Sequence, residues 1–249
     1  PNHAPLVVAE AFGTLAELYP GRIDLGLGRA PGTDAATMRA LRRDRVETEE
    51  DFPRDVAELQ RLLGPVQPGA RIVAMPGAGT NVPIWLLGSS LFSAQLAAHM
   101  GLPYAFASHF APRMLLQALQ LYRQLFRPSA QLARPYAIIG VPVIAAPTDE
   151  EADYLASSTY QRVLGILTGQ RGRLQPPVEN YLAGLQPQER AAIADFLAAG
   201  VVGGPATVRS GLHALAEATQ ADEFMFVSDV YDPQLRLRSL GIAAQAWHD

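Results

Sequence analysis

The chain has 249 residues, of which 49% are hydrophobic and 18% charged, so it is long enough to bury the core of one large domain. Its formal net charge of −4 and the lack of a basic tract argue against a nucleic-acid partner, which requires clustered Lys and Arg. The absence of Cys excludes disulfides, thiolate metal sites and a thiol nucleophile, and it fits a reducing cytoplasm.

The apolar runs are too short to cross a bilayer. The longest, residues 138–146, falls well below the roughly 20 residues that a spanning helix needs. The chain starts at Pro1 with PNHAP, which has neither an initiator Met nor the pattern of a signal peptide. We therefore expect a cytoplasmic protein without a membrane partner, whose given sequence begins inside a longer one.

Expected helices and strands alternate along the chain. Apolar residues at helical spacing, with a proline in the first turn, predict a first helix at residues 5–18. Short apolar runs that end on small or polar residues predict strands at residues 22–28, 83–87, 104–107, 136–146 and 224–227. Helical patterns lie at residues 93–100, 111–126, 148–167, 206–218 and 233–247, and the third of them opens with a capping-box pattern, TDEE.

This alternation predicts an α/β fold with parallel strands joined by right-handed crossovers. Strands that end in small or polar residues favour a (β/α)8 TIM-like barrel, and an open doubly wound sheet is the alternative. Five strand-helix units follow an orphan helix, whereas a closed barrel needs eight strands. We therefore expect an incomplete barrel in which strands 4–8 are present and strands 1–3 are largely missing, with Pro1 at the end of the third.

The whole chain, residues 1–249, is expected to form one partial barrel domain. Residues 169–204 interrupt the alternation of strands and helices. They contain a Pro-Pro pair, a polar stretch and one helical pattern at residues 187–199. We interpret this segment as an insertion after strand 7. It is either a lid or oligomer contact over the barrel mouth or a solvated surface excursion.

Small, polar and charged residues stand at the carboxyl ends of four predicted strands. In a barrel these strand ends converge on one mouth, where the functional site of the fold lies. The residues concerned are Gly28-Arg29, Gly88-Ser89-Ser90, Ser108-His109 and Ser228-Asp229.

The second group is suited to bind an anion. Gly88 permits close backbone approach, Ser89 and Ser90 supply hydroxyls just before a helix, and Ser93 adds another one turn later. Arg29 could make a two-pronged contact with the same phosphate. Alternatively, the serines only cap the helix and Arg29 is an ordinary surface residue.

Among the histidines, His109 is best placed for acid-base catalysis or hydrogen bonding, and a structural role is the alternative. His3 could also line the mouth. Asp24 lies in an apolar strand and is expected to face the interior, where a buried carboxylate needs a partner. The remaining histidines are expected on helix surfaces, and no metal-ligand spacing occurs. They are His99, His213 and His248.

Four segments together resemble the bacterial luciferase-like monooxygenase family, and more narrowly its group of uncharacterised flavin oxidoreductases. They are residues 2–10 (NHAPLVVAE), 19–32 (YPGRIDLGLGRAPG), 85–90 (WLLGSS) and 105–112 (AFASHFAP). The resemblance runs over essentially the whole chain.

The resemblance implies a TIM-like barrel that binds FMN, or in some branches the deazaflavin F420. Arg29, Ser90 and Ser93 match family positions that hold the flavin phosphate, with Gly88 and Ser89 beside them. Ser108 and His109 would lie near the flavin ring or the substrate. The family's main pocket residues, an acidic residue and a His pair after the second strand, would lie upstream of Pro1.

The resemblance further implies a monooxygenase that takes reduced FMN from a separate flavin reductase and uses O2 on a small organic substrate. Members are commonly homodimers. The alternatives are a non-catalytic flavin-binding protein, an F420-dependent oxidoreductase, or a lyase or isomerase of a phosphate ligand, for which no catalytic base can be identified.

Overall fold

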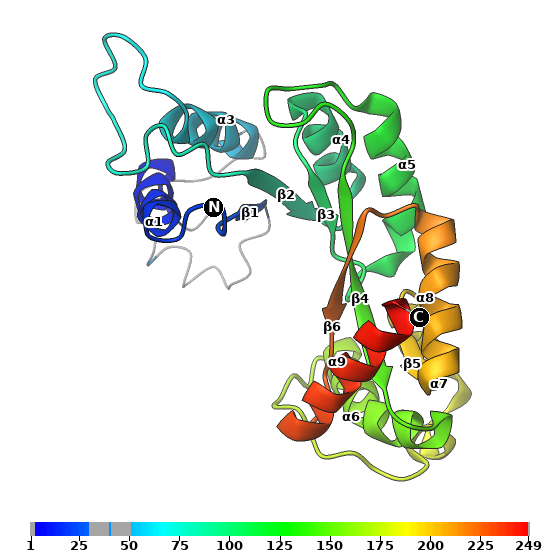
Figure 1. Cartoon of the computed structure of the whole chain (residues 1–249). Coiled ribbons are helices and arrows are strands. Elements are labelled where there is room, and N and C mark those ends of the chain that lie inside the picture. The colour runs from blue at the N-terminus through cyan, green and yellow to red at the C-terminus, as the bar shows by residue number, and fades with distance from the viewer. Residues whose placement is uncertain (1–2, 30–39, 41–50, 249) are drawn as a thin grey trace. The chain divides into compact units, whose positions relative to one another are not determined.

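The computed structural model describes residues 3–29, 40 and 51–248, and helices alternate with strands along them (Figure 1). The strands are β1 (Leu25–Gly28), β2 (Ile84–Gly88), β3 (Tyr104–Phe106), β4 (Ala137–Ala145), β5 (Val201–Gly203) and β6 (Glu223–Val227). The helices are α1 (Pro5–Leu18), α3 (Asp51–Leu63), α4 (Leu91–Met100), α5 (Leu115–Leu125), α6 (Asp149–Leu167), α7 (Pro187–Phe196), α8 (Pro205–Thr219) and α9 (Pro233–His248), with short 3-10 helices η1 (Pro112–Met114) and η2 (Tyr181–Gly184).

The chain divides into two compact units. The first consists of residues 1–105 and 121–136, and the second of residues 106–120 and 137–249. The alternating order confirms the α/β class that the sequence predicts, and β1 with β2, β4 with β5 and β4 with β6 pair in parallel. Pro1, which the sequence analysis places at the end of a third barrel strand, lies outside the described residues.

In the first unit, β1 and β2 form a parallel pair whose register aligns Leu25 with Ile84 and Gly28 with Leu87. The helix α4 follows β2 and packs against it. This helix ends at Gly101, whose φ of 63° lies in the left-handed region that glycine adopts without strain. Parallel pairing places the carboxyl ends of β1 and β2 at one edge.

The helix α3 of the first unit is absent from the sequence-based expectations. Val56, Leu59 and Leu63 recur at helical spacing and are all buried, and the helix packs against α1. Its periodicity was therefore readable in the sequence. The predicted strand at residues 22–28 is shorter in the structure, because pairing with β2 begins at Leu25.

In the second unit, the long apolar strand β4 lies between two parallel partners. Its first half pairs with β6, from Ile138 opposite Glu223 to Pro142 opposite Val227. Its last three residues pair instead with β5, from Val143 opposite Val201 to Ala145 opposite Gly203. The helix α9 packs against β4 and α8 (Figure 1).

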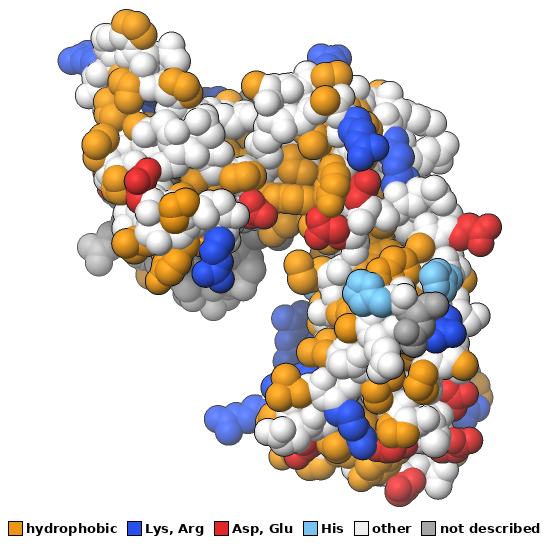
Figure 2. Space-filling view, in the orientation of Figure 1, with side chains coloured by type: hydrophobic (Ala, Val, Ile, Leu, Met, Phe, Trp, Pro, Cys, Tyr) orange, Lys and Arg blue, Asp and Glu red, His pale blue; other side chains and the backbone are white. Residues whose placement is uncertain are grey.

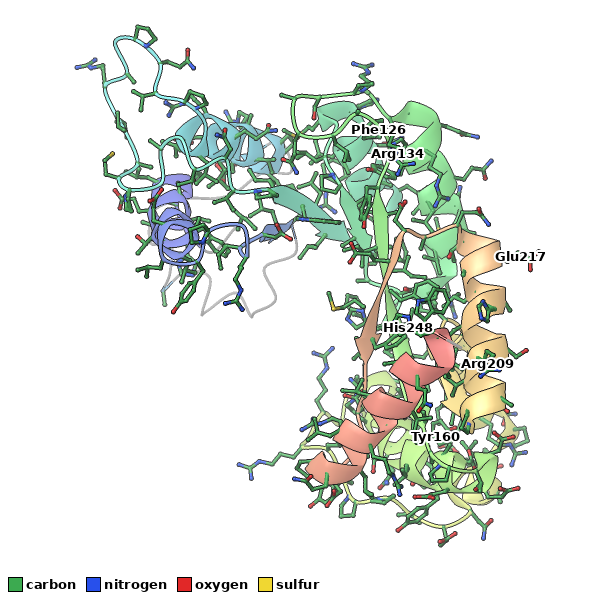
Figure 3. The ribbon with its side chains drawn as sticks, viewed as in Figure 1. Phe126, Arg134, Tyr160, Arg209, Glu217 and His248 are labelled. Carbon is green, nitrogen blue, oxygen red and sulfur yellow. The ribbon has the colours of Figure 1, made fainter. Side chains whose placement is uncertain are left out.

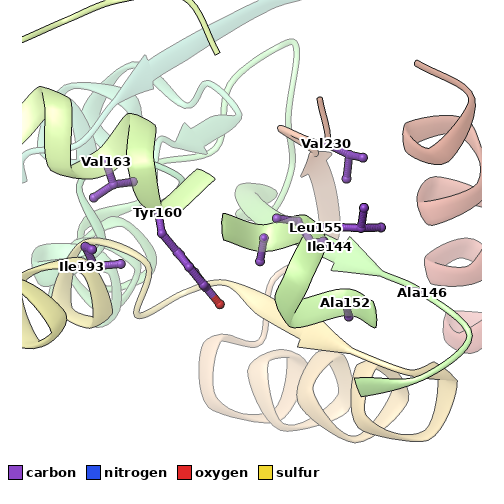
Figure 4. Packing of buried hydrophobic residues seen from close by; sticks show 9 residues of the cluster. Ile144, Ala146, Ala152, Leu155, Tyr160, Val163, Ile193 and Val230 are labelled. Carbon is purple, nitrogen blue, oxygen red and sulfur yellow. The ribbon is translucent and has the colours of Figure 1, made fainter. Parts of the chain in front are cut away.

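Residues 169–204, predicted to be an insertion, contain a helix and a strand that pack against the rest of the second unit. The segment ends in β5, a strand that the sequence analysis does not predict. Its helix α7 buries Ile193 in a core cluster with Ile144 and Leu155 (Figure 4). The segment is thus anchored to the sheet at β5 and to α6 through α7.

The predicted capping box of α6 is half formed. The Thr148 side chain accepts a hydrogen bond from the Glu151 N–H at 3.2 Å, as an N-cap does. The Glu151 carboxylate pairs with Arg238 on α9 rather than with the Thr148 backbone. Further along α6, Tyr160, which is labelled in Figure 3, donates a hydrogen bond to Asp153 at 3.1 Å.

Replacing Ile193 by alanine is expected to lower the free energy of unfolding by about 2–5 kcal/mol, because it removes a 2% exposed side chain from the core. Urea denaturation measures this loss. Ala191→Ser, at an exposed position of the same helix, is the control and should change stability by less than about 0.5 kcal/mol. Equal effects of the two substitutions would show that α7 is not anchored through Ile193.

Candidate functional site

In the first unit, Arg29 and the start of α4 come together. The paired ends of β1 and β2 bring Gly28 opposite Leu87, so Arg29 and Gly88 follow at the same edge. The guanidinium carbon of Arg29 lies 4.6 Å from the ring centre of Phe92, in the first turn of α4. This distance is typical of a cation-π contact. The contact places the positive charge of Arg29 at the N-terminal end of α4, where the free N–H groups of the helix attract anions.

The serines at this helix start are partly engaged with the helix itself. Ser90 is the N-cap and accepts a hydrogen bond from the Ser93 N–H at 3.4 Å. The Ser93 hydroxyl donates to the Ser90 carbonyl at 2.8 Å and lies 3.0 Å from the Tyr104 hydroxyl. Ser90 therefore caps the helix, and the binding of an anion by the serines stays a prediction. Ser89, between β2 and α4, is half-buried.

Tyr104 is a neighbour of this site that the sequence analysis does not single out. Its side chain is fully buried, and burial raises the pKa of Tyr104 to about 12, with the hydrogen bond to Ser93 acting in the opposite direction. The hydroxyl thus stays protonated. Gly88 is required here, because a Cβ at this position would lie 2.2 Å from the Ser93 hydroxyl oxygen.

The second unit holds Ser108 and His109, directly after β3. The buried Ser108 hydroxyl donates a 2.7 Å hydrogen bond to the Gly140 carbonyl of β4. The His109 ring packs on the same residue, and a Cβ on Gly140 would lie 2.3 Å from the His109 Nδ1 atom. Nδ1 is buried and accepts no hydrogen bond from the residues that the structure describes. The glycine in the middle of an apolar strand was the signal for this close approach.

An ion pair lies beside His109. Arg162, on α6, contacts the Asp229 carboxylate at 2.5 Å, just after β6. Burial lowers the pKa of His109 below its ordinary value of 6.5, and the positive charge of Arg162 lowers it further, while Asp229 opposes them. His109 is therefore neutral at pH 7. Arg162 stands in the middle of a helix, where nothing in the local sequence marks it.

We expect an NMR titration of the His109 imidazole to give a midpoint below 6.5. Since the folded-state pKa is lowered, the unfolded chain takes up the proton first as the pH falls. The contribution of this group to stability is complete above about pH 6.5 and is lost as the pH falls through the folded-state pKa. His109→Gln should remove that part of the pH dependence of urea unfolding. A midpoint at or above the ordinary value would contradict the burial of the ring.

The predicted site residues thus form two groups. Arg29, Gly88, Ser89, Ser90 and Ser93 belong to the first unit, and Ser108 and His109 to the second. Their roles toward a ligand stay predictions. The expected acidic residue and His pair of the flavin pocket would come before Pro1, which is not among the described residues, so their presence also stays a prediction.

Other polar residues lie mostly at the surface. Asp24 is exposed, so the expectation of a buried carboxylate is wrong: the chain is not yet paired with β2 there. His3 is exposed and lines a cavity of about 250 Å³ together with residues of α1, β1 and α3. The three remaining histidines are exposed on helices, as predicted, and they are His99, His213 and His248.

Among the described residues, no three His, Cys, Asp or Glu side chains lie together as a metal ion would require. Nor does any helix in that part of the chain have the length and apolar character needed to cross a membrane.

A family model described as luciferase-like monooxygenase matches residues 1–222. A protein of Escherichia coli strain K12 named luciferase-like monooxygenase is 50% identical over 243 residues, which cover 98% of this chain and 72% of that protein. The uncharacterised protein YvbT of Bacillus subtilis is 50% identical over 248 residues, covering 99% of this chain and 74% of its own length.

Solved structures agree with these sequence matches. Apo-MsnO8 is 33% identical and superposes with a TM-score of 0.84, over 99% of this chain and 75% of that one. At the level of fold alone, an FMN complex of the oxygenating constituent of 3,6-diketocamphane monooxygenase from Pseudomonas putida (18% identical, TM-score 0.66, 99% and 76% covered) and an F420-dependent secondary alcohol dehydrogenase (14%, 0.66, 98% and 76%) are also similar. The chain belongs to the luciferase-like monooxygenase family.

Proposed function

We propose that this protein is a flavin-dependent monooxygenase that uses reduced FMN and O2 on a small organic substrate. The observation that carries the proposal is the guanidinium of Arg29 stacked over Phe92, at the start of α4. Family membership supports the reaction class. The proposal includes a separate flavin reductase that supplies the reduced FMN, a homodimeric assembly and a cytoplasmic location. It also assigns β1, β2, β3, β4 and β6 as strands 4–8 of an incomplete (β/α)8 barrel.

The donors at the start of α4 fit the phosphate of FMN. A dianionic phosphate requires a cation and several N–H or O–H donors at one point. Arg29 supplies the cation, the first N–H groups of α4 lack intrahelical partners, and Ser89 and Ser90 supply hydroxyls. The Ser93 hydroxyl already donates to the Ser90 carbonyl, so Ser93 would act on the phosphate through the cap that it stabilises.

The bound reduced flavin would supply the reactivity toward oxygen, and the protein would orient it and exclude water. His109 is neutral at pH 7 and its Nδ1 atom is buried against Gly140 without a hydrogen-bond partner among the described residues, so the proposal assigns the ligand contact to Nε2. In this role the Nε2 atom forms a hydrogen bond with the flavin ring or the substrate. Ser108 fixes the backbone before it through the bond to Gly140.

The test is a titration of the purified chain with FMN, riboflavin and F420, followed by flavin fluorescence and absorbance. The proposal expects binding at micromolar concentrations, with FMN tighter than riboflavin because only FMN carries the phosphate. Spectra that do not change with any of the three would overturn it. Tighter binding of F420 than of FMN would assign the deazaflavin instead, whose reaction is hydride transfer.

A further inference from the structure

A cavity of about 470 Å³ is formed by residues that all belong to the second unit. Its lining consists of Phe110, Arg162, Ile166, Arg171, Gly172 and Phe196. The volume is in the range of small-molecule sites. The charged side chains in this lining are both guanidinium groups, and no carboxylate is among them.

The cavity retains positive charge. Arg162 is paired with Asp229 at 2.5 Å, which neutralises one guanidinium. Arg171, on the exposed segment after α6, forms no ion pair with any residue that the structure describes. One positive charge without an ion-pair partner among the described residues therefore remains in the lining for a ligand.

The rest of the lining is apolar. Phe110 is 51% exposed, and its ring is held edge-on to His109 with the ring centres 4.8 Å apart. Ile166 and Phe196 extend this apolar wall. In Figure 2, blue Arg side chains stand beside orange hydrophobic ones along the left edge of the part of the chain that carries α6 and α9. A large exposed aromatic residue beside guanidinium groups is typical of a binding surface rather than of solvated protein.

We propose that this cavity binds the acidic end of the substrate, which is an organic carboxylate or sulfonate with one negative charge and an apolar body. The single uncompensated guanidinium matches one negative charge, and the planar fork of Arg matches the paired oxygens of these acids. The apolar side chains of Phe110, Ile166 and Phe196 contact the apolar body of the ligand. The assignment of this ligand as the substrate rests on the proposed monooxygenase function.

The experiment measures the binding of phenylacetate, phenylmethanesulfonate and the neutral phenylacetamide to the full chain by calorimetry, with and without saturating FMN. We expect both acids to bind about tenfold or more tightly than the amide, and high salt to reduce the difference. Arg171→Gln should weaken the acids about tenfold and leave the amide unchanged. Arg173→Gln, an exposed arginine two residues further on that does not line the cavity, should change neither.

Several outcomes would overturn the proposal. These are equal affinity for acid and amide, no binding of either acid at millimolar concentrations, or equal losses in the Arg171 and Arg173 variants. Arg171→Gln is expected to leave FMN affinity unchanged, and weakened FMN with unchanged acid binding would assign the cavity to the cofactor. If FMN binds to none of the proteins, the proposed function fails, while the difference between acid and amide still decides the chemistry of the cavity.

Discussion

Arg29→Gln is expected to weaken FMN binding by about 10- to 100-fold, the range for a lost charge-assisted contact. Riboflavin affinity should change little. FMN differs from riboflavin by the phosphate, and the phosphate is the group that the Arg29 guanidinium would meet beside Phe92. The measurement is a pair of fluorescence titrations, with FMN and with riboflavin, on the same protein samples.

The matched control is Arg22→Gln. Arg22 is exposed before β1, and its guanidinium carbon lies 5.9 Å from the ring centre of Tyr19. It therefore has the same charge as Arg29 and a similar aromatic contact, but it does not lie at the start of α4. We expect its FMN affinity to equal that of the unchanged protein. Equal loss of FMN and riboflavin in Arg29→Gln would show that Arg29 supports the fold of the site and not the phosphate.

Gly140→Ala is expected to destabilise the second unit by about 1–3 kcal/mol, the usual cost of overpacking a well-packed core. The added methyl group would lie 2.3 Å from His109 Nδ1, and β4 is held in place between β5 and β6. The imidazole must therefore move, and outside its buried position its titration midpoint should return toward the ordinary value. Urea denaturation and the NMR titration of His109 measure the two effects.

A double variant separates the clash from other effects of the methyl group. In Gly140→Ala combined with His109→Ala the ring is gone, so the loss in stability should be smaller than the sum of the two single losses. Gly241→Ala is the control, because nothing lies within 4 Å of its added methyl group on α9, and it should be neutral or stabilising by up to about 1 kcal/mol. Additive losses would show that the ring is not held against Gly140.

The elements that the sequence predicts well are those with a strong local signal. The helix at residues 5–18 agrees with α1 residue for residue, and the predicted strands fall on β1, β2, β3, β4 and β6. Residues that follow strands, such as Arg29 and Ser90, could be predicted as candidates for the anion site, because the carboxyl ends of parallel strands lie at the same edge of the sheet. Among the elements that were not predicted, α3 and β5 differ in kind. The helix α3 has an apolar periodicity in its sequence, whereas the three residues of β5 form a strand because β4 is there to pair with.

The α/β class, the family and the residue types available for an anion could be inferred from the sequence, since periodicity, turn residues and short motifs are local properties of the chain. The pairing of Arg162 with Asp229, the need for a glycine at position 140 beside His109 and the exposure of Asp24 became known only from the folded chain. These facts depend on contacts between segments far apart in the chain, and local patterns carry no information about such partners. The candidate anion site could be predicted from the residue types that follow neighbouring strands. The arginine-lined cavity could not, because its lining residues come from separate segments that only the folded chain brings together.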